Sequence, residues 1–133
     1  MATKYPHLLT EDALVWDRYL GTHNLTEARF YYDVRVGIGR PVGEEYPDNI
    51  RKMATDLSQR RIDVLIEQPD LFTIIEITTT ASLKAIGQLA VYRHLFMLDR
   101  QPTKPVKTIL VCSSMDPDLI SFCTTYGLEY AVV

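Results

Sequence analysis

The feature that most constrains the fold of this chain is a pair of apolar runs, each of which contains a single acid. Asp63 lies in the run 61–66 and Glu76 lies in the run 72–78, with the turn-forming residues 68–70 between them. β-Branched and other apolar residues prevail in both runs, and a short turn between such runs predicts a β-hairpin. If the two strands pair, the two carboxylates can meet.

The position of each acid in its strand predicts the face on which it lies. Because strand side chains alternate, Asp63 should lie opposite Ile62 and Val64, and Glu76 should lie opposite Ile77. The alternative for either acid is a surface position at a strand edge. Glu76, however, is flanked by isoleucines, where an unpaired carboxylate is desolvated at a cost. Mg²⁺ binds one or two carboxylates of this kind, so the pair predicts a metal site.

A glutamine follows the two acids on the next segment of helical periodicity, at Gln88. The succession of Asp63, Glu76 and Gln88 resembles the motif of the PD-(D/E)XK nuclease superfamily, the restriction-endonuclease and Holliday-junction-resolvase-like group. The resemblance implies that the two acids bind Mg²⁺ or Mn²⁺ and that Gln88 orients the site. It also implies hydrolysis of DNA phosphodiesters by a metal-activated water.

One element of the superfamily motif is missing. The motif has a lysine two residues after the second acid, and this chain has Thr78 there. That lysine orients or deprotonates the attacking water and stabilises charge in the transition state, so its replacement affects the chemistry itself. Lys84 precedes Gln88 by four residues and shares its helix face, which makes it a candidate for a relocated catalytic cation that also contacts nucleic acid. The alternative is a solvated lysine on an exposed helix.

Further charged residues are candidates for the same site. Some members of the superfamily add a helix acid to the metal ligands, and the first predicted helix offers Glu11, Asp12 and Asp17, of which Glu11 is preferred. Arg61 shares a face with Asp63, which makes it a candidate for binding a nucleic-acid phosphate. A salt bridge from Arg61 to one of the two acids is the alternative.

Periodicity and turn residues predict the order of elements along the chain. Helices are expected over 11–20, with Thr10 as N-cap and Gly21 as stop, and over 49–60, 81–98 and 117–126; strands are expected over 28–38, 61–66, 72–78, 106–112 and 128–133. This order, αβ(α)ββαβαβ, is that of the superfamily core. It predicts an α/β (α+β) fold with a restriction-endonuclease-like three-layer core, in which helices flank a mixed central sheet. One domain should span residues 1–133, with an elaborated segment at about 39–60.

Composition bounds the classes of function. A chain of 133 residues with 47% hydrophobic and 23% charged residues suits one soluble domain, and no apolar run has the roughly 18 residues of a membrane span, so no membrane partner and a cytosolic location are expected. The net charge of −3 argues against coating nucleic acid by bulk electrostatics, so any DNA contact should be local. Cys112 and Cys123 lack metal-ligand spacing and are expected to be buried hydrophobes.

A second class of function is consistent with the same residues. Since Thr78 carries no charge, the chain could keep the nuclease fold without its catalysis and serve as a structural, assembly or DNA-binding module. A component of a phage virion or of a head-tail connector would suit a small acidic chain of this kind. Protein partners or a homo-oligomer, formed for example through an edge strand at 128–133, are compatible with either class.

Overall fold

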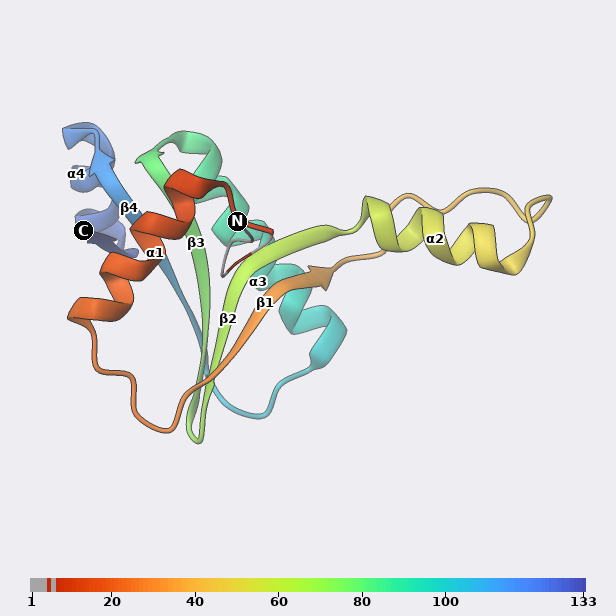
Figure 1. Ribbon diagram of the computed structural model, residues 1–133, viewed down its shortest axis with the longest axis horizontal. Helices are drawn as coiled ribbons and strands as arrows, with labels where there is room; N and C mark the ends of the chain where they lie inside the picture. Colours follow the sequence, from red (N-terminus) through yellow and green to blue (C-terminus); the bar gives the residue numbers. More distant parts are fainter. Residues whose placement is uncertain (1–4, 6) are drawn as a thin grey trace.

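The computed structural model describes residue 5 and residues 7–133. Their elements, in chain order, are α1(Thr10–Thr22), β1(Arg29–Val36), α2(Asp48–Ser58), β2(Arg60–Gln68), β3(Leu71–Ala81), α3(Leu83–Arg100), β4(Val106–Met115), α4(Pro117–Tyr126) and β5(Glu129–Val132). The strands form one mixed sheet in the order β1-β2-β3-β4-β5 (Figure 1). Neighbouring strands are antiparallel from β1 to β3 and parallel from β3 to β5. The predicted α/β class with a mixed sheet is confirmed.

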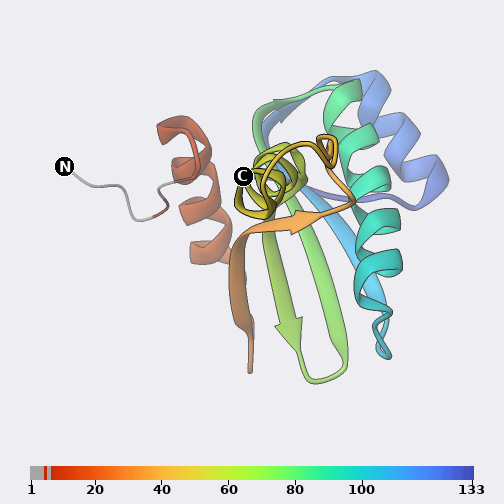
Figure 2. The same cartoon turned by 90° about the vertical axis from the view of Figure 1, so that its right-hand side faces the viewer.

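Helices cover both faces of the sheet, with α1 on one side and α3 and α4 on the other (Figure 2). On the α1 side, Trp16 packs in a cluster with Ile75 and Val111. On the opposite side, Phe96 of α3 packs in a cluster with Leu110. Burying apolar residues on both faces explains why β3 and β4 are apolar along their length rather than alternating with polar residues. The result is a three-layer arrangement.

Local signals explain the ends of some helices better than others. Asp116 caps α4, since its Oδ1 accepts a hydrogen bond of 2.8 Å from the N–H of Asp118, and Gly127 ends the helix with a φ of 68°. At α1 the prediction was wrong: the helix starts one residue earlier, with Leu9 at the N-cap position and no side-chain cap, and it continues through Gly21. Among the described residues, no helix is both long enough and apolar enough to cross a membrane.

The predicted hairpin forms, but the prediction that Ile62 and Val64 lie on the same face of β2 is wrong. Val64 pairs with Ile75 across β2 and β3, as expected for a turn at residues 69–70. Val64 packs in the cluster under α1, whereas Ile62 packs in the cluster under α3. The regular alternation of side chains between the two faces of β2 is interrupted at Asp63. On the neighbouring strand β1, Asp33 lies beside this point and has a φ of 56°. A positive φ at a non-glycine residue bends the strand pair and turns the following side chains to the other face.

The elaborated segment forms an arm that projects away from the sheet (Figure 1). The arm comprises residues 37–59 and contains α2, none of whose residues is buried. Ile50, Met53 and Leu57 lie on one face of α2 and are all exposed. The helix is therefore held by its own hydrogen bonds and by the loop beside it rather than by the core.

Candidate functional site

A carboxylate pair lies just beyond the last paired residues of β2 and β3, Val64 and Ile75, where the two strands separate. Glu76 of β3 is only 8% exposed and Asp63 of β2 is half-buried. The Oδ2 atom of Asp63 accepts a hydrogen bond of 2.9 Å from the backbone N–H of Ile77, which fixes the carboxylate beside β3. The Oε2 atom of Glu76 is buried and has no hydrogen-bond partner among the described residues. A buried oxygen of this kind is costly unless a ligand or a proton satisfies it.

Burial and mutual repulsion raise the pKa values of both acids. Burial is the largest cause for Glu76, and the charge of Asp63 raises its pKa further. Burial also raises the pKa of Asp63, although the N–H of Ile77 opposes that effect. Both pKa values are raised, so the pair retains a proton to a higher pH than two exposed carboxyl groups would when no cation is bound.

Two further charges act on the pair from the flanking helices. The carboxylate of Asp12 on α1 raises the pKa of both acids, and Lys84 on α3 lowers that of Glu76. Glu11, the helix acid that the sequence favoured, is exposed, and its charge acts on Asp12 instead. The α1 carboxylate whose charge acts on the pair is therefore Asp12.

A polar row on α3 extends the site. Gln88 donates a hydrogen bond of 3.2 Å from Nε2 to the hydroxyl of Tyr92. Tyr92 is buried, and burial followed by the charge of Glu76 raises the pKa of its hydroxyl. Lys84, Gln88 and Tyr92 are spaced by four residues, which places them on one helix face. Tyr92 was not predicted as a site residue, although its spacing of four from Gln88 was a usable signal.

Other residues near the pair have roles that differ from the expectation or were not foreseen. Arg61 forms an ion pair with Asp33 at 2.9 Å rather than with either site acid. Thr78 is half-buried, and its hydroxyl donates to the backbone oxygen of Thr80 at 3.3 Å. His7 lies with its Nε2 atom 3.2 Å from the backbone oxygen of Asp63, a contact that no sequence spacing indicated.

The donor set suits a hard divalent cation in part. No group of three or more histidine, cysteine, aspartate or glutamate side chains is arranged to hold a metal ion in the described part of the chain. Asp63 and Glu76 supply two carboxylates, and Mg²⁺ needs no more than one or two when water fills the remaining positions. The unsatisfied Oε2 atom of Glu76 is an open ligand position of this kind.

Comparisons with known proteins do not assign a function to the site. The chain matches no family model, no curated protein and no solved structure. The resemblance to the PD-(D/E)XK superfamily therefore stays a prediction that rests on the motif residues.

Proposed function

We propose that this chain is a PD-(D/E)XK nuclease-like protein with a rearranged site, in which Asp63 and Glu76 bind Mg²⁺ or Mn²⁺ for hydrolysis of DNA phosphodiesters. The observation that carries the proposal is the buried Oε2 atom of Glu76, which has no hydrogen-bond partner among the described residues and lies beside a second carboxylate. Two adjacent carboxylates with raised pKa values are costly together. A divalent cation between them would remove both their repulsion and the unsatisfied oxygen.

Each residue of the site would have a distinct role. A bound divalent cation supplies a water of lowered pKa and polarises the phosphate. Asp63, held by the N–H of Ile77, and Glu76 fix the position of the cation. Asp12 adds negative charge from α1 and would favour a divalent over a monovalent ion.

Lys84 is the candidate for the missing cation of the motif. Its charge acts on Glu76, and its ammonium group has no carboxylate partner among the ion pairs of the described residues. A lysine in this place would stabilise the charge that develops on the phosphate during attack. Gln88, which bonds Tyr92, would orient the groups around it.

The alternative is a catalytically inactive module of the same fold with a structural, assembly or DNA-binding role, for example in a phage virion or a head-tail connector. Thr78 favours this alternative, because its half-buried hydroxyl is engaged with the backbone of Thr80 and carries no charge. Lys84 is exposed, so holding it over a phosphate has an entropic cost that a buried lysine would not have.

The deciding experiment is cleavage of supercoiled and branched DNA with Mg²⁺ or Mn²⁺ by the wild type, Glu76→Ala and Lys84→Ala. Lys52→Ala, which removes an exposed lysine of the arm, is the control. If the site works, both site variants lose about 10²-fold or more of the rate and the control keeps it. If the pure wild type shows no metal-dependent cleavage, the result favours the inactive module. Calorimetry with Mn²⁺ measures metal binding separately from cleavage.

A further inference from the structure

We infer that the hollow at the base of the arm binds a phosphate group of a nucleic-acid strand through Arg40 and Arg60. The inference deepens the proposed function and rests on it in one respect, because the bound strand is expected to continue toward Asp63 and Glu76. Binding of the phosphate itself requires no hydrolysis. The inference supplies the local basic contact that an acidic chain needs in order to bind nucleic acid at all.

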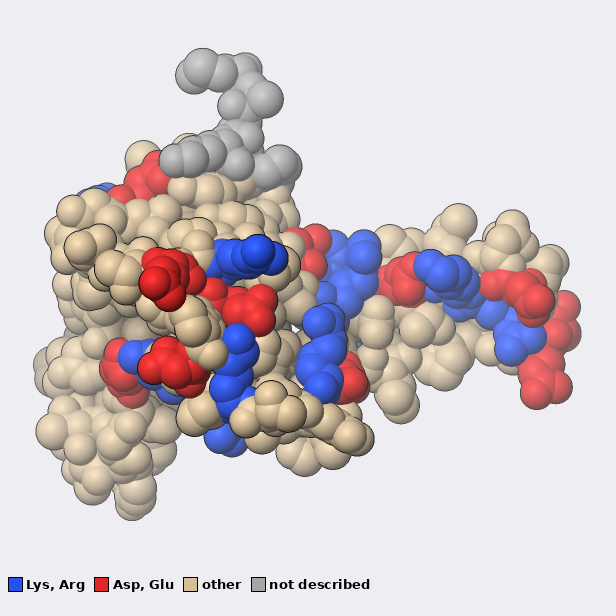
Figure 3. All heavy atoms as spheres, turned by 90° about the horizontal axis from the view of Figure 1, so that it is seen from below, with Lys and Arg blue, Asp and Glu red and all other residues tan. Residues whose placement is uncertain are grey.

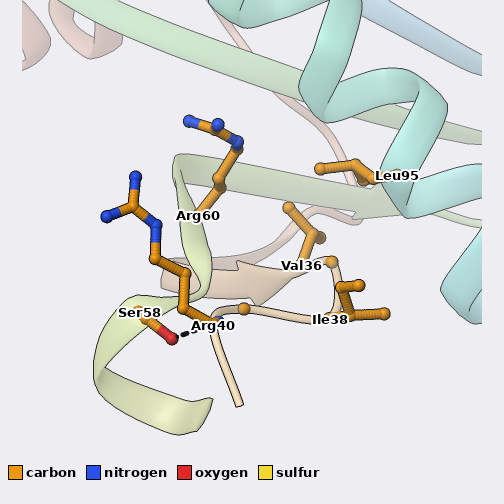
Figure 4. A pocket seen from close by; sticks show the side chains of 8 residues that line it. Val36, Ile38, Arg40, Ser58, Arg60 and Leu95 are labelled. Carbon is orange, nitrogen blue, oxygen red and sulfur yellow. Dashed lines mark hydrogen bonds between the residues drawn. The ribbon is translucent and has the colours of Figure 1, made fainter. Parts of the chain in front are cut away.

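The hollow has a volume of ≈ 400 Å³ and lies between the two ends of the arm and α3. Figure 4 shows Val36, Ile38 and Leu95 on one side of it and the guanidinium groups of Arg40 and Arg60 together on the other. None of the described residues that line it is acidic. The hollow therefore combines an apolar wall with two positive charges, a composition that suits the sugar and the phosphate of a nucleotide.

Both arginines are available for a ligand. Neither side chain has a hydrogen-bond or ion-pair partner among the described residues, and both are exposed. Arg51 and Arg61, by contrast, are each paired with an aspartate. Each guanidinium carries five N–H donors in a fork that matches the oxygens of a phosphate. An anion bound in the hollow would meet the positive charges of both side chains that line it.

Hydrogen bonds across the base of the arm hold the hollow in shape. Gln59 donates from Nε2 to the backbone oxygen of Gly37 at 2.6 Å, and the backbone N–H of Arg40 donates to Oγ of Ser58 at 2.5 Å. Gly39 has a φ of 70°, and a Cβ atom there would come within 2.7 Å of a backbone oxygen of α2. The two chain segments that carry Arg40 and Arg60 are thus locked together, which reduces the entropy lost on binding.

The hollow and the carboxylate pair share strand β2, since Arg60 lines the hollow and Asp63 follows it three residues later. Arg60 precedes Asp63 on β2, and its charge lowers the pKa of the Tyr92 hydroxyl, the same hydroxyl whose pKa the charge of Glu76 raises. The space-filling view shows basic side chains gathered where the arm leaves the body (Figure 3). A strand with one phosphate between Arg40 and Arg60 would therefore run toward the acids, with the arm beside it.

The test is fluorescence anisotropy of labelled single-stranded and duplex DNA, without divalent cations, at a series of salt concentrations. The variants are Arg40→Ala, Arg60→Ala and the double variant; Arg51→Ala, an arm arginine already paired with Asp48, is the matched control. Each single variant should weaken binding about tenfold, and the double variant should reduce the salt slope by about 2. The control should stay within about twofold of the wild type.

Further arms of the experiment separate the inference from the proposed function. Unchanged affinity and salt slope in the double variant, with its melting temperature intact, overturns the inference. If the alanine variants fold poorly, Arg40→Lys with Arg60→Lys replaces them, and it should lose affinity because lysine lacks the bidentate fork.

Glu76→Gln should bind DNA as the wild type does while losing cleavage. Arginine-dependent binding without any cleavage keeps the inference and removes the hydrolase. Inorganic phosphate and a mononucleotide, added as competitors, show whether a single phosphate suffices or a strand is needed.

Discussion

At the residue scale, Glu76 is the residue whose environment departs furthest from that of an ordinary glutamate. It is buried, and one of its oxygens has no partner among the described residues. The charges of Asp63 and Asp12 raise its pKa, and the charge of Lys84 lowers it. Since a protonated glutamate is favoured in the folded chain, the stability of the metal-free protein should depend on pH in an unusual direction.

The sign of that dependence follows from the raised pKa. The folded protein keeps a proton on Glu76 that the unfolded chain releases, so the associated stability is complete below the ordinary glutamate pKa of 4.5 and is lost as the pH rises toward the raised value. Melting temperatures in EDTA should therefore fall as the pH rises from about 5 to about 9. Glu76→Gln should flatten the fall by about 1.4 kcal/mol for each pKa unit traversed. Glu44→Gln, on the exposed arm, should leave it unchanged.

Restoring the motif lysine provides a second residue-scale prediction. Thr78 lies two residues after Glu76 on β3, so a lysine there would share the face of the acids. Thr78→Lys should raise metal-dependent DNA cleavage by about tenfold or more, since a positioned cation or proton donor contributes on that scale. Thr80→Lys, at an exposed position of the same strand, is the control. An inert Thr78→Lys in a protein that still binds Mn²⁺ would contradict the proposed placement of the site.

At the element scale, the arm and the hairpin differ in the contacts that stabilise them. The hairpin is built into both apolar clusters, through Ile74 on one face and Ile75 on the other. The arm buries no residue of α2 and joins the body through a few hydrogen bonds at its base, such as that from Gly37 N–H to Asp99 at 2.8 Å. Elements with so little buried surface contribute little to global stability.

Removal of the arm tests this contrast. Residues 41–57 replaced by a Gly-Ser link should leave the melting temperature nearly unchanged, because the chain ends at Arg40 and Ser58 already touch through a hydrogen bond of 2.5 Å. A loss of more than about 2 kcal/mol in chemical denaturation would show that the arm supports the sheet. Phe96→Ala, which creates a cavity in the apolar cluster under α3, is the comparison variant. It should lower the free energy of unfolding by about 3–5 kcal/mol.

At the scale of the whole molecule, one sheet is shared by two apolar clusters. Trp16, the one tryptophan of the chain, reports on the α1 cluster, while far-ultraviolet circular dichroism reports on the helices of both faces. Because both clusters rest on β3 and β4, they should unfold together. Tryptophan fluorescence and circular dichroism should therefore give coincident denaturation curves. An earlier fluorescence transition would mean that α1 detaches before the sheet unfolds.

Local sequence determined much of the framework of this protein. The hairpin, the cap of α4 by Asp116 and the stop at Gly127 follow from side-chain alternation and backbone preferences that act within a few residues. The burial of Cys112 and Cys123 follows in the same way from apolar surroundings, and both are buried and free. The meeting of Asp63 with Glu76 belongs to this class, because a short turn fixes their register.

Only the tertiary structure decided what surrounds that pair. Whether Glu11 or Asp12 faces the acids depends on the rotation of α1 against the sheet, and the selection of Asp33 as partner of Arg61 depends on the bend of β1. These contacts join residues far apart in the chain, and their geometry is set by how layers pack and twist rather than by local preference. The sequence likewise predicts a helix in the arm. Only the fold shows that the apolar face of this helix, α2, packs against no core.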